Sequence, residues 1–406
     1  MTMTNDIHHD LQSLIEPELP ALVAIRHDLH AHPQLAFKET YASGVVQREL
    51  RAMGIPLVPQ VAGTGVVGWI VPEDEAAARQ PAVALRADMD ALPITEETGL
   101  PYASCGEDYR GRMHACGHDG HTTILLGAAR VLNKLRSRLP RPVKLIFQPA
   151  EEVGGGAQRM IEAGVLDERL GGCAVGRIFG LHGWPGLPLG TIATRPGPMM
   201  ASTDLFHIKV QGKGGHAAMP HLVRDPILAA AQIITALQSI VSREIPPSVP
   251  AVVSVAKFHA GSTENVIPDT AEFAGTIRAL DDDTRQLLNR RVGEVAKAVG
   301  QAMRCAVTME LTEGYPPTHN DANLAAAVLT TGRQVLGDAA AQTLDRPLTV
   351  AEDFAYYGQS VPACFFFLGL RPPDQAAYPA LHTPGFDFND DAIPIAIRMM
   401  CALALA

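Results

Sequence analysis

The order of predicted secondary structure changes near residue 200 and changes back near residue 315, and this switch limits the folds open to the chain. Between these points the sequence predicts strands at 204–215, 251–261, 270–280 and 306–317, and helices at 225–243 and 282–303. This β-α-β-β-α-β order is that of the ferredoxin-like split unit. A segment of about 110 residues with this order can fold as a domain of its own.

On both sides of this segment, strands alternate with helices. The predicted strands are 65–71, 82–90, 142–150, 177–182 and 363–370, and the predicted helices are 19–34, 41–54, 122–138, 157–166 and 320–337. Such alternation is typical of an α/β layer with a mostly parallel sheet. A chain of 406 residues also exceeds the ~250–300 at which single cores tend to split. We therefore expect an α/β domain built from residues 1–198 and 315–406, interrupted by an inserted ferredoxin-like α+β domain at 199–314.

Composition narrows the classes of partner. The net charge is −10 and no basic run occurs, which argues against nucleic acid. The first residues, MTMTNDIHHD, lack the basic-then-apolar pattern of a signal peptide, and we expect no apolar run near the ~20 residues of a membrane helix. Six scattered cysteines do not resemble a disulfide framework. The sequence therefore predicts a protein of the reducing cytoplasm without a membrane partner.

A dinucleotide site is not expected, although GTGVVG at 63–68 matches G-x-G-x-x-G. That fingerprint needs a strand before the glycines and a helix after them. Here the glycines lead into a predicted strand, so the match carries no cofactor.

The segment HACGHDGH, residues 114–121, concentrates side chains that bind metals or move protons. Cys116 and His118 lie two residues apart just before a predicted helix, and such a turn can direct both toward one point. A thiolate and an imidazole are suitable ligands for a borderline cation. A single such pair is also compatible with a structural role. We expect His121 to face along the helix and leave His114 undecided.

Further ligand-type residues follow other predicted strands. Glu151 and Glu152 follow one strand, His182 ends another, and His382 lies in a loop after the strand at 363–370. Ligands of parallel sheets bind at the carboxyl ends of the strands. Each residue alone fits an ordinary loop, but together they predict a metal centre at this edge.

The adjacent glutamates point to a reaction. Two neighbouring carboxylates do not easily bind one ion, so one can bind metal while the other accepts a proton from metal-activated water. This chemistry is metal-assisted hydrolysis of an amide.

Long motifs across residues 20–390 resemble one family. In chain order they are RHDLHAHPQLAFKE, LRADMDALPI, MHACGHDGHTTILLGAA, FQPAEEVGGGAQRMIEAG, GLHGWP, GGHAAMPH, NVIPD and AEDFAYY. They closely resemble metal-dependent amidohydrolases that include hippurate hydrolases, aminoacylases and indole-acetyl-amino-acid hydrolases. The resemblance implies a zinc-exopeptidase-like catalytic domain, an inserted ferredoxin-like lid and a homodimer, or a dimer of dimers, formed through the lid.

The same resemblance implies roles for particular residues. Two divalent ions per subunit, zinc first and manganese, cobalt or nickel as alternatives, would be held by Cys116, His118, Glu152, His182 and His382. Glu151 would be the general base. One of Asp88 and Asp90 would orient a ligand, with strand-end capping as an equal alternative.

The inserted domain is expected to contribute to substrate binding. The family resemblance implies that His216 donates a hydrogen bond to the developing oxyanion, often in the partner subunit's site. It also implies that Asn265 and Arg278 bind the substrate carboxylate. His30 and His32 are assigned to packing and hydrogen bonding. Ala351 departs from the serine usual in the family, so any role of that hydroxyl is in doubt.

The expected function is hydrolysis of the amide bond of N-acyl amino acids, such as hippurate-like or N-acetyl substrates. N-Acetyl-diaminopimelate deacetylase and dipeptidase or carboxypeptidase activity remain alternatives on the same scaffold. More remote alternatives are a thiol hydrolase with Cys116 as nucleophile and a non-catalytic metal-binding protein. The sequence does not choose the acyl group or the amino acid.

Overall fold

The computed structural model describes residues 10–104 and 106–406, and the chain divides into two compact units. We call residues up to Gly197 together with His319–Asp345 and Asp353–Ala406 the main unit. The inserted unit comprises Pro198–Thr318 and also Arg346–Glu352, which lie inside the expected third segment. This short segment joins the inserted unit because the backbone of Ala201 donates hydrogen bonds to the carbonyls of Leu348 and Val350.

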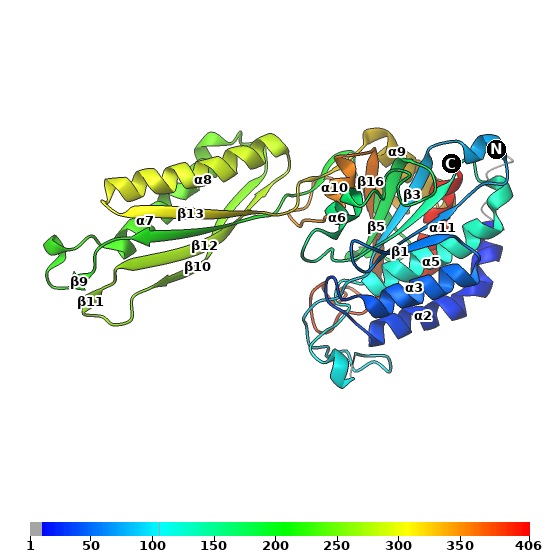
Figure 1. Ribbon diagram of the computed structural model, residues 1–406, viewed down its shortest axis with the longest axis horizontal. Coiled ribbons are helices and arrows are strands. Elements are labelled where there is room, and N and C mark those ends of the chain that lie inside the picture. The colour runs from blue at the N-terminus through cyan, green and yellow to red at the C-terminus, as the bar shows by residue number, and fades with distance from the viewer. Residues whose placement is uncertain (1–9, 105) are drawn as a thin grey trace. The chain divides into compact units, whose positions relative to one another are not determined.

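The main unit is built on a mixed eight-stranded sheet (Figure 1). Its strands, in sheet order, are β1 (Leu57–Val61), β2 (Gly65–Ile70), β4 (Val143–Gln148), β3 (Ala82–Asp88), β5 (Val175–Pro188), β16 (Ala363–Arg371), β6 (Ile192–Thr194) and β15 (Ala341–Thr343). The central four, β4, β3, β5 and β16, are parallel to one another, and β1 and β2 are antiparallel neighbours at one edge. The central strands therefore present their carboxyl ends at one edge of the sheet.

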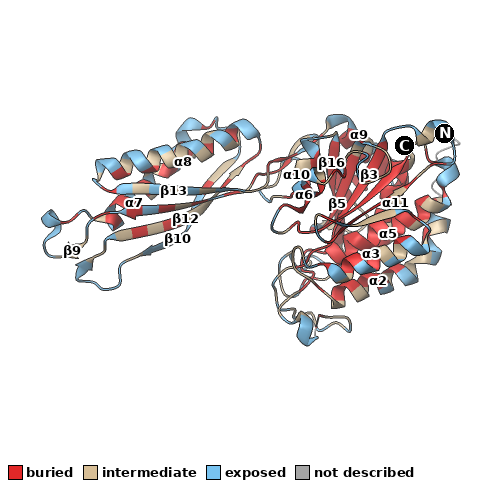
Figure 2. Cartoon of the chain, in the orientation of Figure 1, coloured by how far each residue is buried: buried red, intermediate tan, exposed pale blue. Residues whose placement is uncertain are grey.

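Helices cover both faces of this sheet. On one face α5 (His118–Lys134) packs on β3 and contacts α2 (Leu19–Ala31), α3 (Thr40–Ala52) and α11 (Ala392–Leu405), and α11 contacts α9 (Ala322–Leu336). On the other face lie the short helices α6 (Gly156–Glu162) and α10 (Ala355–Gly358). All seven residues of β3 are buried, as expected for a parallel strand covered on both sides. Figure 2 shows this continuous buried core.

The inserted unit has the predicted ferredoxin-like order. Its elements are β8 (Asp204–Gln211), β9 (Gly215–His216), α7 (Pro226–Ser239), β10 (Ala251–Ala260), β11 (Val266–Ile267), β12 (Thr270–Ala279), α8 (Asp282–Ala302) and β13 (Ala306–Glu313). The antiparallel sheet has the order β10-β12-β8-β13. Along β8, buried and more exposed residues alternate, because one face of the sheet packs on the two helices and the other does not.

Two sequence expectations need correction. The strand expected to end at His182 continues to Pro188, so His182 lies inside β5. The helical segment Pro226–Glu244, which ends in a π-helical turn, is long and apolar enough to cross a membrane by length and composition alone. Ile233 and Leu237 of this segment are indeed buried in the core of the inserted unit.

The glycines of GTGVVG lie between and within the antiparallel strands β1 and β2. No helix follows them directly, which agrees with the rejection of a dinucleotide site.

Candidate metal centre

The five predicted ligands of the main unit converge at the carboxyl edge of the central strands. They form two groups whose ligand atoms lie within 4.8 Å of one another, one of Cys116, His118 and His182 and one of Cys116, Glu152 and His382. The Cys116 Sγ lies 3.2 Å from Nε2 of His182 and 3.2 Å from Nε2 of His382. A set of five ligands in two overlapping groups that share one thiol fits a pair of neighbouring cations.

Backbone geometry brings these residues together. Gly117 has φ 84°, a left-handed conformation that lets the chain turn between Cys116 and the first residue of α5, His118. A Cβ at this position would lie 2.9 Å from Phe388. His382 also has a left-handed φ of 61°, and its N–H donates a 2.8 Å hydrogen bond to the Ala115 carbonyl. The cysteine turn and the distant histidine loop are therefore joined directly.

Buried polar atoms at the centre lack partners. Within the described residues, Nε2 of His118 and Oε1 of Glu152 have no hydrogen-bond partner although both atoms are buried. The Glu152 oxygen lies 3.2 Å from His382 Nε2 and 4.0 Å from His118 Nε2. Unsatisfied buried ligand atoms are costly, and a cation between them would satisfy both. The residues present therefore fit the expected metal.

The charges of the centre also favour a cation. Burial, together with the carboxylates of Glu152 and Glu151, raises the pKa of the Cys116 thiol well above its usual value. Burial alone would lower the pKa of His118, but the nearby carboxylates of Asp88 and Asp90 outweigh it and raise this pKa to about 10. Without a metal, the centre therefore retains protons that a divalent cation would displace.

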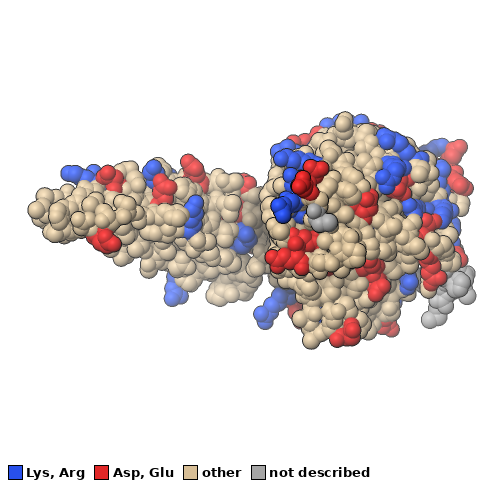
Figure 3. Space-filling model, turned by 90° about the horizontal axis from the view of Figure 1, so that it is seen from below, with Lys and Arg blue, Asp and Glu red and all other residues tan. Residues whose placement is uncertain are grey.

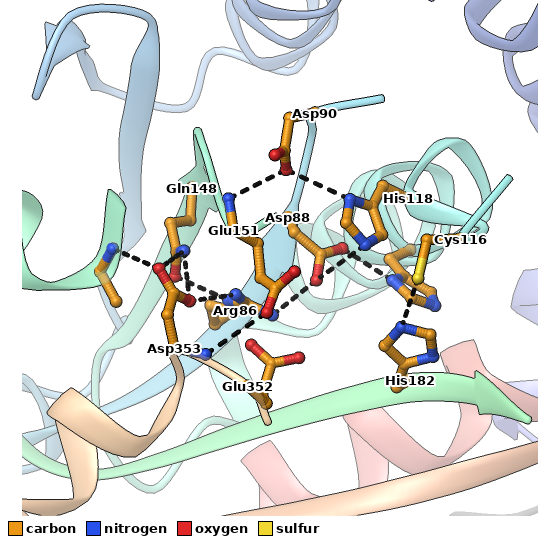
Figure 4. A network of polar contacts seen from close by, with 12 residues as sticks. Arg86, Asp88, Asp90, Cys116, His118, Gln148, Glu151, His182, Glu352 and Asp353 are labelled. Atoms are coloured by element: carbon orange, nitrogen blue, oxygen red, sulfur yellow. Dashed lines mark hydrogen bonds and ion pairs between the residues drawn. The ribbon is translucent and has the colours of Figure 1, made fainter. Parts of the chain in front are cut away.

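Asp90 connects two ligand segments. Its carboxylate accepts hydrogen bonds from the N–H groups of Glu151 and Glu152, both at 3.0 Å. It also lies 3.2 Å from Nδ1 of His118, and Figure 4 shows its contacts with Glu151 and His118. This arrangement orients His118 and fixes the turn that carries the paired glutamates. Asp90 thus has the geometry expected of a residue that orients a ligand.

Asp88 lies in a chain of buried hydrogen bonds beneath the centre. It accepts from Nδ1 of His121 at 2.7 Å and from Arg86 at 2.7 Å. The second nitrogen of His121 accepts a 2.9 Å hydrogen bond from the Gly183 N–H. Both ring nitrogens of His121 are therefore engaged, which excludes it as a ligand in this arrangement.

A second network holds Glu151 from the C-terminal part of the chain. The N–H of Asp353 donates a hydrogen bond to a Glu151 carboxylate oxygen at 3.4 Å. The Asp353 carboxylate accepts from Arg86, from the Gln148 amide and from the Ala157 N–H. Sequence reasoning missed Arg86 and Asp353. For Arg86, the available signal was an arginine in the interior of the strand AVALRAD, where apolar residues flank it on both sides.

Three other histidines of the main unit, His30, His32 and His114, have surroundings that suit a structural role. His30 lies 2.7 Å from Asp119 and 3.2 Å from Glu96, and His32 stacks on Tyr41. These contacts agree with the assignment of both to packing and hydrogen bonding. His114 is buried, and burial lowers its pKa to about 4.

The predicted substrate residues lie in the inserted unit. His216 pairs with Val266 in the β9–β11 ribbon, and its Nδ1 accepts a 3.1 Å hydrogen bond from the Ala218 N–H. Asn265 is exposed beside this ribbon, and its carbonyl accepts from the Ala217 N–H. Arg278 is near the end of β12 and donates to the Ile277 carbonyl.

Within the inserted unit, His216 and Asn265 lie far from Arg278. The ribbon precedes β12, and Arg278 is the ninth of the ten residues of that extended strand. At ~3.3 Å per residue the separation is roughly 25–30 Å.

Comparison with known proteins identifies the family. The chain matches peptidase family M20/M25/M40 over residues 84–406. It is 40% identical to an N-acetyl-L-cysteine deacetylase of Bacillus subtilis, over 92% of this chain and 84% of that protein. It is also 40% identical to IAA-amino acid hydrolase ILR1-like 4 of Arabidopsis thaliana, over 94% of this chain and 84% of that protein.

A solved structure gives the same answer. A Bacillus subtilis protein described as a dinuclear metal binding peptidase from the M20 family superposes with a TM-score of 0.81 at 34% identity, covering 96% of this chain and 98% of that one. The family match and the shared fold together define a hydrolase of the metallopeptidase type. The chain belongs to peptidase family M20/M25/M40. The predicted family resemblance and fold class are confirmed.

Proposed function

We propose that the protein is a metal-dependent hydrolase that cleaves the amide bond of N-acyl amino acids. The observation that carries this proposal is the pair of ligand groups that share Cys116, with Glu151 beside Glu152 and His118. Its relatives are named for deacetylation of N-acetylcysteine and for hydrolysis of IAA-amino acids, and both reactions break an amide between an acyl group and an amino acid.

The proposed cofactor is a pair of divalent cations, held by Cys116, His118, Glu152, His182 and His382. When bound, the cations would supply Lewis acidity that lowers the pKa of a water molecule from 15.7 toward about 7. The softness of the Cys116 thiolate favours zinc, and manganese, cobalt and nickel remain alternatives.

Glu151 is the proposed general base. Glu151 is 7% exposed. Two contacts set its position: its backbone N–H donates to the Asp90 carboxylate, and its side-chain carboxylate accepts from the N–H of Asp353. Its carboxylate would accept the proton of the attacking water and deliver it to the amine nitrogen of the leaving amino acid.

Cys116 is a poor candidate for a nucleophile. A reactive thiol needs a lowered pKa, whereas burial and the neighbouring carboxylates raise the pKa of Cys116. The metal-ligand role therefore has better physical support than the thiol-hydrolase alternative.

A homodimer is proposed because the predicted substrate residues are divided along the inserted unit. His216 and Asn265 lie at one end of β12 and Arg278 near the other, too far apart to bind one small substrate from one chain. Two copies could each supply one end to a site.

The inserted unit also has a surface for a second copy. The outward side of α7 has exposed, uncharged residues, including Ile227 and Leu228, and β10 is an edge strand of the sheet. Such a surface is suited to a second copy.

Other expectations about partners rest on charge and cysteine chemistry. On the face shown in Figure 3, basic and acidic side chains are interspersed rather than gathered into a basic patch, which supports the prediction that nucleic acid is not the partner. Localisation in the reducing cytoplasm stays a prediction, consistent with the need to keep Cys116 reduced.

The test is hydrolysis of a substrate panel by chelator-treated and Zn²⁺-reloaded protein. The panel contains N-acetylcysteine, hippurate, an indole-acetyl-amino acid, N-acetyl-diaminopimelate and a dipeptide. We expect turnover of at least one N-acyl amino acid, its loss after chelation and its return with metal. Turnover of the dipeptide alone would favour the dipeptidase alternative, and full turnover without metal would reject the proposal.

A further inference from the structure

Glu39 is a buried carboxylate that the proposed reaction does not use. It lies between α2 and α3, is 0% exposed, and is far in sequence from every proposed ligand. Its Oε1 accepts hydrogen bonds from the N–H groups of Phe37 and Ala150, both at 2.9 Å. Its Oε2 accepts from the Thr64 hydroxyl. A buried carboxylate with three donors is fixed in position.

The contact with Ala150 matters because Ala150 directly precedes the proposed base, Glu151, and the proposed ligand, Glu152. Ala150 has φ 55°, a left-handed conformation that is unfavourable for a residue with a Cβ. Strained backbone of this kind persists only where surrounding groups hold it. The groups that hold Ala150 therefore also set the path of the chain into both glutamates.

Three consecutive N–H groups in this turn are bound by two buried carboxylates. The N–H of Ala150 donates to Glu39, and those of Glu151 and Glu152 donate to Asp90. The turn is thus held from two sides, and without Glu39 only the Asp90 side would remain for these donors.

Glu39 also fixes the residue that packs on the far part of the same turn. Phe37, whose N–H binds Glu39, has φ 61°, and a Cβ on Gly154 would lie 2.6 Å from its ring. Gly154 itself has φ 100°. The guanidinium of Arg159 in α6 lies 4.1 Å from the centre of the Phe37 ring. One carboxylate therefore supports both ends of the segment from Ala150 to Gly154.

We propose that Glu39 is a positioning residue that holds the left-handed Ala150 peptide and thereby places Glu151 for proton transfer and Glu152 for metal binding. The expected effect of Glu39 on kcat rests on the proposed function. The expected effect on Zn²⁺ affinity rests on the metal-binding geometry alone.

Glu39→Ala and Glu39→Gln form a matched pair. Glutamine keeps the Oε1 acceptor for both backbone N–H groups, and its amide can donate to the Thr64 hydroxyl. Alanine removes all three contacts. We expect Glu39→Ala to lower kcat and Zn²⁺ affinity each by about 10–100-fold, the range typical for groups that orient ligands, with KM changed by less than about threefold. Glu39→Gln should stay within about threefold of wild type in both.

Zn²⁺ affinity is measured by competition with a chromogenic chelator, and kcat and KM with the best N-acyl amino acid. Glu49→Ala is the control, because Glu49 lies on α3 of the same unit and pairs with Arg130 instead of the turn. It should leave affinity and kcat unchanged. If Glu39→Ala does not fold, Glu39→Asp, which is one methylene shorter, should show the same direction of effect.

The outcomes separate this inference from the proposed function. A folded Glu39→Ala protein with wild-type Zn²⁺ affinity and kcat would overturn the inference while leaving the function intact. Equal losses in Glu39→Gln and Glu39→Ala would also overturn it, because charge and not hydrogen-bond geometry would then be responsible. Weakened Zn²⁺ binding in Glu39→Ala, in a protein that hydrolyses no N-acyl amino acid, would support the positioning role and reject the function.

Discussion

The two units use buried charge differently. The core of the main unit contains fully buried Arg26, Arg86, Asp88, Asp119 and Asp353. In the inserted unit, the described buried residues with charged side chains are Asp204 and Glu352. Burying a charge is costly unless it is paired, so a stable domain has little reason to accumulate such groups. Three of them, Arg86, Asp88 and Asp353, form one paired group, and the N–H of Asp353 donates to Glu151. We propose that this group is retained because it supports the candidate metal centre.

The burial patterns along the strands of the two units reflect this difference. In the inserted unit a simple amphipathic pattern is sufficient, since β8 and β12 bury mainly alternate residues against α7 and α8. In the main unit, β3 is buried along its whole length and still includes Arg86 and Asp88. Two predictions test whether the buried charges of the main unit contribute more to its free energy of unfolding than exposed charges contribute to that of the inserted unit.

The largest expected effect is at Arg86. Arg86→Met leaves the buried carboxylates of Asp88 and Asp353 without their shared guanidinium, and loss of one partner of a buried pair typically costs about 3–5 kcal/mol. Both tryptophans, Trp69 and Trp184, belong to the main unit, so tryptophan fluorescence during urea unfolding reports on this unit.

The control for Arg86 is an exposed pair in the inserted unit. Lys209 lies 3.4 Å from Glu272, with side chains 48% and 40% exposed, and Glu272→Gln should change stability by less than ~1 kcal/mol. Its unfolding is followed by far-UV circular dichroism, since no tryptophan lies in that unit. Equal costs for the two substitutions would contradict the comparison.

A smaller effect is expected from His30. Burial lowers its pKa, but Asp119 and Glu96 outweigh burial and raise the pKa to about 9, against 6.5 unperturbed. The stabilisation from this raised pKa is fully present below pH 6.5 and is lost as pH rises through 9, and its upper limit is about 3 kcal/mol.

The measurement is the difference in unfolding free energy between wild type and His30→Gln, followed by tryptophan fluorescence. It is made in chelator, so that pH-dependent metal binding does not contribute. We expect the difference to shrink between pH 6.5 and 9. A difference that is constant over this range would show that His30 is not held in its charged form.

Much of the fold could be predicted because strong local patterns decide it. The ferredoxin-like order of the inserted unit follows from its alternating and amphipathic patterns, and the strands β3, β4 and β16 follow from short, nearly continuous apolar runs. The extension of β5 beyond His182 could not be predicted, because GWPGLP contains glycine and prolines that usually end a strand. Its pairing with β16 continues to Pro188 and outweighs this preference.

The ligand set could be proposed from motifs, but the groups that hold it could not. Glu39 and Asp353 reach the Glu151 turn across 111 and 202 positions of sequence. Nothing local to either residue signals that contact, because it depends on how the strands and loops meet in space. The distance between Arg278 and the pair His216 and Asn265 could not be predicted from the motifs either. It follows from the length of β12, which separates them in the folded unit.

The central claim is that the two adjacent glutamates have different tasks, and substitution of each tests it most directly. Zinc content per chain and kcat for an N-acyl amino acid are measured for Glu151→Gln and Glu152→Gln after Zn²⁺ loading. We predict that Glu151→Gln keeps the wild-type zinc content while kcat falls by about 10²–10⁴-fold, and that Glu152→Gln loses zinc. Unchanged kcat in Glu151→Gln with full zinc content would contradict the account.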